Sequence, residues 1–222
     1  MSSDEYPVTP RNRVRQIRQK AAYDKDSVHG VLDAAPYASV AFIEDGAPVV
    51  VPMLFGREDE CIFLHGARKA RIVKLLEENE RVALNVTLVD ALVIARSAFN
   101  SSMNYRSATV FGTPRLVEGA EAKLHAMKVI SEHVMPGRWD ELRAPRAKEV
   151  KMSGIIAVAI DSASAKIADD SSPDDEEADY EIPVWAGILP VETRYTTLVD
   201  GDRLVEGVEP SAVVRALENA KL

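Results

Sequence analysis

Three cations, Arg68, Lys69 and Arg71, directly follow the dipeptide His65-Gly66 and carry the clearest chemical signal of the sequence. The apolar residues within 72–76 fall on one face at helical spacing, which places the cations in the first turns of a predicted helix. A helix N-terminus carries a partial positive charge, so cations there are unfavourable unless an anion is bound. Exposed N–H groups, the dipole and three cations together favour a phosphate site, with a solvated basic turn as the alternative.

The segment before this turn predicts two paired strands. Residues 49–55 form an apolar run rich in β-branched side chains, and residues 61–64 form a second run after a polar turn. Pro52 lies inside the first run. Because proline cannot donate to a β-ladder, the strand must be unpaired on one side there, at an edge, a bulge or a gap filled by a ligand.

The rest of the chain predicts many short strands with few helices between them. We expect further strands at 38–43, 81–86, 91–95, 104–117 (broken at 112–114), 154–160 and 182–190, with a tight hairpin turn at 44–46. We expect helices at 28–35 (capped by Ser27), 120–134, within 139–152 and at 211–222, and the helix at 120–134 is amphipathic, with Leu124 and Met127 in its apolar stripe. This order predicts a mostly β, α+β fold, a closed or partly closed barrel with helices at its ends. No linker stands out, so we expect a single domain over 1–222, with an irregular N-terminal arm (1–23) and an acidic loop (168–181).

Charge is concentrated in one place. The net charge is −8, but residues 169–181 hold eight acids and no Lys or Arg, so the remainder has 27 basic and 27 acidic residues. Nothing global repels a phosphorylated ligand or attracts nucleic acid. The basic segment 11–20 lacks aromatic stacking residues, which favours a solvated or partner-docking arm.

The cellular setting is predicted from what the chain lacks. A single cysteine, Cys61, favours a reducing compartment, and no apolar stretch is long enough to span a bilayer. We therefore expect a cytoplasmic protein that does not bind membranes.

Familiar catalytic motifs are also missing from the sequence. There is no GxSxG, Walker, GxGxxG or HExxH pattern, and His65, His125 and His133 do not have metal-ligand spacing. We therefore expect no metal site and assign no catalytic residue. An anion site beside apolar strands suits a cofactor that supplies its own chemistry.

Several segments together resemble the pyridoxamine 5′-phosphate oxidase-like, FMN-binding split-barrel family, in particular the flavin-nucleotide-binding branch that includes nitroimidazole-resistance proteins. The matching segments are VVVPMLFG (49–56), FLHGARKAR (63–71), ARSAFNSSMNYRSATVFGTPRLVE (95–118) and DYEIPVWAGILPV (179–191). With the VHGVLDAA helix and the PGRWDE turn they cover most of the chain in the family's order.

The resemblance implies an FMN site completed by a second subunit of a homodimer. The flavin ring would lie along the first matching strand, the phosphate at the strand-to-helix turn, and a tryptophan over the cofactor. The residues implied are Val50, Val51, Pro52 and Met53 at the isoalloxazine, His65, Gly66, Arg68, Lys69 and Arg71 at the phosphate, the family's Tyr-Arg-Ser element at Tyr105, Arg106 and Ser107, and Trp185 over the ring.

Two departures from the family pattern affect the expected activity. Residues 100–102 are Asn-Ser-Ser where relatives commonly have His-His-Ser, and Ala-Asp-Asp at 168–170 stands where relatives often have Arg-Thr-Gly. The arginine-rich C-terminal substrate motif of true pyridoxamine phosphate oxidases is also missing, so that activity is not expected.

The function expected from the resemblance is electron transfer between FMN and a small-molecule donor or acceptor, as in a flavin reductase or nitroreductase-like enzyme. Two alternatives stay open. One is a flavin carrier or sensor without turnover. The other is a haem-binding split barrel, for which His65 is the iron ligand available near the expected site.

Overall fold

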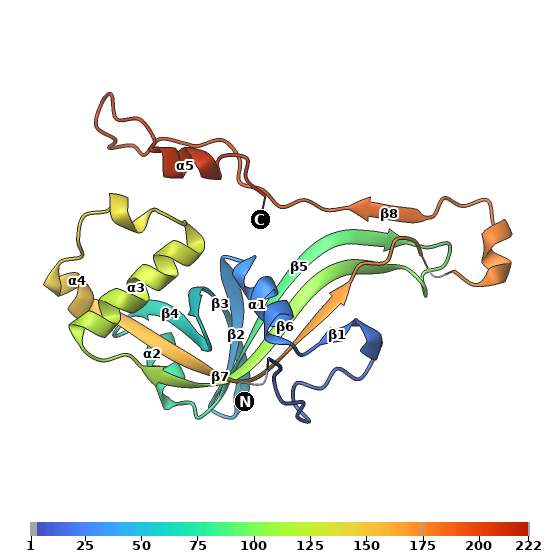
Figure 1. Cartoon of the computed structure of the whole chain (residues 1–222), viewed down its shortest axis with the longest axis horizontal. Helices are drawn as coiled ribbons and strands as arrows, with labels where there is room; N and C mark the ends of the chain where they lie inside the picture. The colour runs from blue at the N-terminus through green and yellow to red at the C-terminus, as the bar shows by residue number, and fades with distance from the viewer. Residues whose placement is uncertain (1–3, 174, 222) are drawn as a thin grey trace. The chain divides into compact units, whose positions relative to one another are not determined.

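The computed structural model describes residues 4–173 and 175–221, which form a mostly antiparallel sheet with helices (Figure 1). The α+β class expected from the sequence is confirmed. The elements in chain order are the 3-10 helix η1 (Arg18–Lys20), β1 (Ala21–Ala22), α1 (Lys25–Asp33), β2 (Tyr37–Glu44), β3 (Ala47–Glu58), β4 (Cys61–Ala67), α2 (Arg71–Glu78), β5 (Val82–Ile94), β6 (Ser102–Leu116), α3 (Ala120–Val134), η2 (Trp139–Glu141), α4 (Ala147–Met152), β7 (Ser153–Ala168), η3 (Glu177–Glu181), β8 (Gly187–Pro190) and α5 (Ala212–Leu217).

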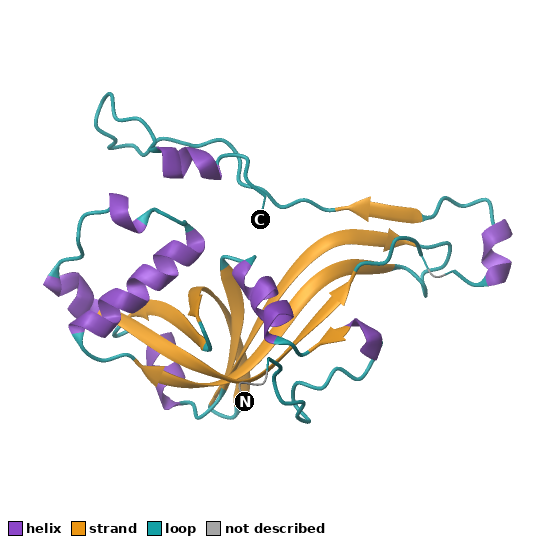
Figure 2. Cartoon of the chain, in the orientation of Figure 1, coloured by secondary structure: helices purple, strands orange, loops and turns teal. Residues whose placement is uncertain are grey.

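Contacts divide the chain into two compact units, each built from three separate stretches. Unit 1 comprises Met1–Leu32, Asn85–Val110 and Ser162–Glu192, and unit 2 comprises Asp33–Leu84, Phe111–Asp161 and Thr193–Leu222. Strands β5, β6 and β7 contribute residues to both units, and the strand order of the sheet is β1-β7-β4-β3-β2-β5-β6, with β8 beside β5. Figure 2 shows the stretch after β8 as loop apart from α5.

Unit 2 is built on an antiparallel run of strands, β2-β3-β4-β7. The expected tight turn between β2 and β3 is present, with Asp45 and Gly46 at φ values of 50° and 77°. Positive φ at both central residues is the requirement of a type I′ hairpin turn. Pro52 pairs with Ser39 of β2, whereas the pairing of β3 with β4 covers Phe55 to Glu58. In the described structure, Pro52 therefore has the one-sided pairing that the sequence predicts.

The two faces of the β2–β3 hairpin differ in what covers them. Side chains on one face, among them Phe42 and Phe55, are buried in the core. The other face is mostly exposed, with its central β2 positions half-buried, and is almost entirely apolar. We call it the hairpin face, and it consists of Tyr37, Ser39, Ala41, Ile43, Pro48, Val50, Pro52 and Leu54, which pair across the two strands. Strand alternation explains how one hairpin carries both surfaces.

Helix α3 packs on β3 and β4 and has the bounds that the sequence predicts. The contact is closest at Gly56, where a Cβ atom would lie 2.6 Å from the Cα atom of Ile130. Gly112 of β6 is equally constrained, because a Cβ atom there would lie 2.3 Å from the carbonyl oxygen of Ala159. Glycine at these positions allows helix and strand backbones to approach each other without side chains between them.

Unit 1 contains the acidic loop, and part of that loop is fixed. The side chain of Asp175 is 0% exposed; its carboxylate accepts hydrogen bonds from the backbone N–H of Arg96 at 3.0 Å and from its guanidinium at 2.8 Å. Arg96 also lies over the ring of Tyr180, 5.2 Å from its centroid. The other acids have no such burial, and Asp174 lies outside the described residues. The loop is therefore anchored just beyond the end of β5 through Arg96, and Asp170 adds an ion pair with Lys20.

Several element boundaries differ from the sequence predictions. Segments 81–86 and 91–95 form a single strand, β5, and β6 runs through the expected break at 112–114. Helix α1 begins at Lys25, because the Asp24 carboxylate, not Ser27, caps it by accepting the Ser27 N–H at 2.8 Å. Only residues 187–190 of the strand expected at 182–190 are paired, as β8. The closing helix is α5, shorter than expected but capped by Ser211 as predicted.

The N-terminal arm is not irregular throughout, since η1 and β1 lie within it, and β1 pairs with β7. Residues 1–3 of the arm and Leu222 lie outside the described residues. Among the helices of the described chain, none is both long and apolar enough to cross a membrane.

Candidate functional site

The turn of residues 68–71, the basic turn, is held against the sheet by a pair of glycines. Gly66 of β4 and Gly154 of β7 face each other, and both lie beneath Val73 of α2. A Cβ atom at Gly154 would lie 2.7 Å from Val73 Cγ1 and 2.9 Å from the Cα atom of Arg68. The Arg68 N–H also donates to the carbonyl oxygen of Met152 at 2.8 Å. These contacts fix the start of α2 at the end of β4.

The charges of the basic turn differ in how they are neutralised. Helix α2 begins at Arg71, so Arg68 and Lys69 precede the helix, in contrast to the prediction that they lie in its first turns. Arg71 donates from Nε to Glu44 at 2.7 Å and from Nη2 to the same carboxylate, while Arg68 lies 3.2 Å from the carboxylate of Glu77. Lys69 is exposed and has no ion-pair partner among the described residues. A phosphate at this turn would find one free ammonium and two arginines in exposed, weak ion pairs.

The four residues expected along the flavin ring alternate between the two faces of β3. Val50 is 62% exposed and Pro52 is exposed beside it, so both lie on the hairpin face. Met53 is buried, and Val51 is half-buried on the same inward side. The exposed pair presents an apolar surface that a planar ring can cover.

The Tyr-Arg-Ser element lies on β6 in unit 1, and its polar groups are already bonded. Arg106 donates to Asp90 at 2.8 and 3.0 Å, and these hydrogen bonds raise the pKa of Arg106. Ser107 donates to the carbonyl oxygen of Val86 at 3.0 Å and accepts from the amide of Asn85 at 3.1 Å. Both side chains therefore stabilise the β5–β6 pair, and Tyr105, directly before them, is half-buried.

Trp185, also in unit 1, precedes β8 and is 66% exposed. Its six-membered ring folds back over Gly187, where a Cβ atom would lie 2.9 Å from Trp185 Cζ2. Glycine at 187 lets the indole lie along the backbone, so that much of its surface faces outward.

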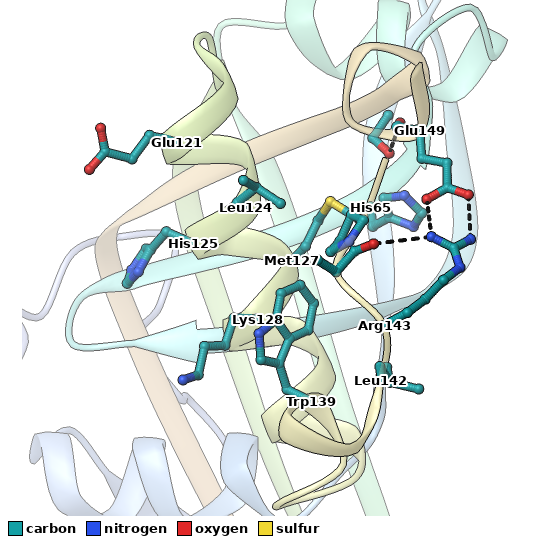
Figure 3. Close-up of a pocket in the computed structure, with 13 residues that line it drawn as sticks. His65, Glu121, Leu124, His125, Met127, Lys128, Trp139, Leu142, Arg143 and Glu149 are labelled. Carbon is teal, nitrogen blue, oxygen red and sulfur yellow. Dashed lines mark hydrogen bonds and ion pairs between the residues drawn. The ribbon is translucent and has the colours of Figure 1, made fainter. Parts of the chain in front are cut away.

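Unit 2 also contains a hollow that the sequence did not predict, which we call the α3 pocket (Figure 3). It has a volume of about 820 Å³ and lies between α3, the segment from η2 to α4 and the ends of β4 and β7. Its walls are mainly apolar, with polar groups on β4, on α3 and near α4. The lining residues are His65, Glu121, Leu124, His125, Met127, Lys128, Trp139, Leu142, Arg143, Ala144, Pro145, Glu149 and Ser153. The size is that of a site enclosing a cofactor-sized ligand, roughly 300–1,000 Å³.

His65 belongs to this pocket and lies within β4, not in the strand-to-helix turn where the sequence placed it. Its ring is accessible from the pocket but crowded by the walls, and this desolvation lowers the pKa of His65. No hydrogen bond to its ring is present within the described residues. A neutral imidazole with a free nitrogen facing an apolar hollow is a suitable ligand for a metal ion that a cofactor carries.

The polar edge of the pocket is an arginine–glutamate pair. Arg143 donates from Nη1 and Nη2 to the two carboxylate oxygens of Glu149, at 2.9 and 2.6 Å, and Figure 3 shows this bidentate pair. Glu149 also accepts the backbone N–H of Arg146 at 2.8 Å, which caps α4. The bonds to Arg143 and Arg146 lower the pKa of Glu149 to about 2. The carboxylate is therefore ionised at ordinary pH, and the pair stays formed.

The α3 pocket was not predicted, because its lining residues come from separate segments and form no common sequence motif. Leu124 and Met127 were assigned to the core-facing stripe of α3, but in the structure they are half-buried and line the pocket. Two further histidines lie on α3. His133 packs on Phe55, and His125 pairs with Glu58 at 2.7 Å. No group of three or more potential metal ligands occurs among the residues that the structure describes.

Comparison with known proteins identifies the family of this chain. Residues 24–167 match the model of the pyridoxamine 5′-phosphate oxidase family, and the fold is that of the family's split barrels. The chain therefore belongs to the pyridoxamine 5′-phosphate oxidase family. A search of curated protein sequences found no match.

Two solved structures are similar over nearly the whole chain. The flavocytochrome Anf3 from Azotobacter vinelandii is 32% identical, with a TM-score of 0.88 over 96% of this chain and 98% of its own. The FAD and heme binding protein from Mycobacterium smegmatis is 34% identical, with a TM-score of 0.85 over 90% of this chain and 98% of its own. A putative 5-nitroimidazole resistance protein from Bacteroides thetaiotaomicron shares the fold at 24% identity, with a TM-score of 0.57 over 68% of this chain and 90% of its own.

Proposed function

We propose that this protein binds a flavin nucleotide and passes electrons between it and a small molecule. The observation that carries the proposal is the similarity to two proteins described as a flavocytochrome and as an FAD and heme binding protein, each more than 30% identical over at least 90% of the chain. A bound flavin would supply one- and two-electron transfer, and the protein would bind and orient it.

The chain's own residues fit this ligand in two places within unit 2. Val50 and Pro52 offer an exposed apolar strip for the ring. The basic turn offers Lys69, which has no ion-pair partner in the described part of the chain, together with Arg68 and Arg71 in weak pairs. We keep FMN as the expected form, because the sequence has no glycine-rich pyrophosphate loop. FAD is the flavin named for the relative from M. smegmatis.

The cofactor can be identified directly. The purified protein would be heated, and the released flavin separated by chromatography and weighed by mass spectrometry. Stoichiometric FMN is the expected result. Stoichiometric FAD would replace FMN but keep the flavin proposal, and recovery of no flavin from protein expressed with riboflavin would overturn it.

We also propose that the protein is a homodimer, because the hairpin face needs a cover. An antiparallel sheet tolerates a solvated face when that face is polar, but this one is apolar along both strands. A second copy of the chain would cover the face and bring its Trp185 to the flavin ring. Sedimentation of the holoprotein tests this, and a monomer that binds flavin tightly would contradict a shared site.

A second ligand, haem, is favoured by the α3 pocket. The two relatives named above are described as a flavocytochrome and as a heme binding protein, and this pocket has apolar walls, an uncharged imidazole and an arginine at its edge. We propose that His65 holds the haem iron there. An absorption spectrum with a Soret band that His65→Ala removes is the expected result, and a band that survives this change would refute the assignment.

Whether the flavin turns over is a separate test. Under anaerobic conditions the reduced protein would be mixed with nitro compounds or quinones, and flavin reoxidation followed by absorbance. Reoxidation within seconds supports an oxidoreductase, whereas a flavin that stays reduced with every acceptor favours the carrier or sensor alternative.

A further inference from the structure

We propose that Arg143 binds a haem carboxylate by exchanging it for Glu149, so that Glu149 acts as an internal competitor for the ligand of the α3 pocket. This inference rests on the proposed haem site. It assigns the pocket a ligand class, a planar apolar body with carboxylates on its edge, and names the residue that limits its affinity.

The geometry of the pair is the first support. Arg143 holds both carboxylate oxygens of Glu149, at 2.9 and 2.6 Å, so its guanidinium fork is arranged for one carboxylate. Side-chain exposures of 59% and 41% show that both partners are open to exchange. A fork of this kind binds any carboxylate in the same bidentate way.

Glu149 can release Arg143 without becoming an unpaired charge. Its carboxylate also accepts the Arg146 N–H at 2.8 Å, as part of the capping of α4. This hydrogen bond does not involve Arg143, and the Glu149 side chain is 41% exposed, so water can solvate the carboxylate after exchange. The exchange therefore replaces one exposed carboxylate by another at the same guanidinium, and leaves the helix cap intact.

The other cation of the pocket is less suited to this role. Lys128 lies 4.0 Å from Asp140, at the outer limit of an ion pair, and also lines a neighbouring hollow together with His125 and Glu58. An ammonium is a point charge on a mobile stem and does not fix a planar carboxylate. Arg143 is thus the group that would orient the ligand.

The test is a Soret titration of the haem-free, full-length protein with ferric protoporphyrin IX and with its dimethyl ester, which has no free carboxylate. Arg143→Ala should weaken binding of the diacid by about tenfold, the loss of one charge-assisted contact, and leave ester binding unchanged. Glu149→Gln should tighten diacid binding several-fold, because the amide competes weakly for Arg143 yet still accepts the Arg146 N–H.

The chain offers a matched control in a second arginine–glutamate pair. Arg138, directly before η2, pairs with Glu141 at its end at 2.6 Å, and neither residue is among those that line the α3 pocket. Arg138→Ala and Glu141→Gln should therefore leave both titrations as in the wild type. Circular dichroism melting of each variant, with Arg143→Lys as the charge-retaining substitution, separates loss of a ligand contact from loss of folding.

The outcomes distinguish the two proposals. Diacid binding that depends on His65 but is unchanged in Arg143→Ala and Glu149→Gln would overturn the exchange and keep the haem site. Equal loss of diacid and ester binding in a folded Arg143→Ala variant would also overturn it. No Soret complex at all, or one indifferent to His65→Ala, would overturn the haem proposal itself.

Discussion

The hairpin face and the α3 pocket lie on the same unit but present opposite kinds of surface. The hairpin face is an open strip in which Val50 is 62% exposed. The pocket is bounded by helix, loop and strand ends of one copy of the chain. A ligand on the strip needs a second subunit to enclose it, whereas a ligand in the pocket does not. Flavin binding should therefore depend on the dimer, and haem binding should not.

The largest effect is expected on replacing His65, which should distinguish ligand binding in the α3 pocket from ligand binding on the hairpin face. The sequence assigns this residue to the flavin phosphate, but the structure places its ring in the pocket. His65→Ala should abolish the Soret band of haem-loaded protein and leave flavin content unchanged, because the iron loses its protein ligand. Absorbance at the Soret and flavin bands measures both at once. Loss of flavin with retention of haem would reverse the assignment.

The next largest effect is expected on replacing Trp185, which tests whether flavin binding depends on the dimer. Trp185→Ala should lower flavin affinity and dimer stability together, and dilution should release flavin from the wild type, since a ligand shared between subunits stabilises the dimer by mass action. Trp139→Ala, in the pocket wall, is the control and should leave flavin affinity nearly unchanged while weakening haem binding. Fluorescence titration and sedimentation velocity provide the measurements.

Substitutions in the basic turn should weaken flavin binding to different degrees, according to how well each side chain can bind a phosphate. Arg71→Ala should weaken flavin binding by roughly 1.5–3 kcal/mol, the value of a charge-assisted hydrogen bond. Lys69→Ala should have a smaller effect, because a mobile ammonium is better solvated. Equilibrium dialysis against FMN compares the two. If both variants bind FMN as tightly as the wild type, the basic turn is only solvated and does not bind the phosphate. The hairpin face must then bind the flavin without it.

The smallest expected effect is the loss of stabilisation by Glu149, at the edge of the α3 pocket, at low pH. The pKa of Glu149 is about 2 in the folded chain against an ordinary 4.5, so its stabilisation is present above pH 4.5 and is lost as the pH falls toward 2. Glu149→Gln should therefore lower the melting temperature slightly at pH 6 and have no effect near pH 2. If the melting temperatures of Glu149→Gln and the wild type differ by the same amount at both pH values, the Arg143–Glu149 pair adds nothing to stability.

The sequence predicted what depends on local patterns. The I′ turn at Asp45-Gly46, the bounds of α3 and the one-sided pairing at Pro52 follow from residue type and spacing over a few positions. The basic turn was found for the same reason, since its charges are adjacent in the sequence. Its ion partners were not found, because Glu44 lies on β2 and Glu77 lies near the far end of α2.

The pocket could not be predicted because it is a space between elements. His65 and Trp139 have no sequence relation, and they line one hollow only because α3 packs on β3 and β4 at Gly56. The break expected in β6 failed in a related way. Glycine usually interrupts a strand, but Gly112 is needed where another backbone approaches within reach of its missing Cβ.

The division of the chain into interleaved stretches has a consequence for how the protein is made. Unit 1 needs Ser162–Glu192 and unit 2 needs Thr193–Leu222, so neither is complete until the last third of the chain is available. The pairing of Ala91 with Pro190 joins strands that are synthesised far apart in time. Closing such distant pairs places folding among the slower classes, roughly milliseconds to seconds. During synthesis the apolar strands of both units therefore emerge before their partners exist, which makes the nascent chain a natural client for chaperones.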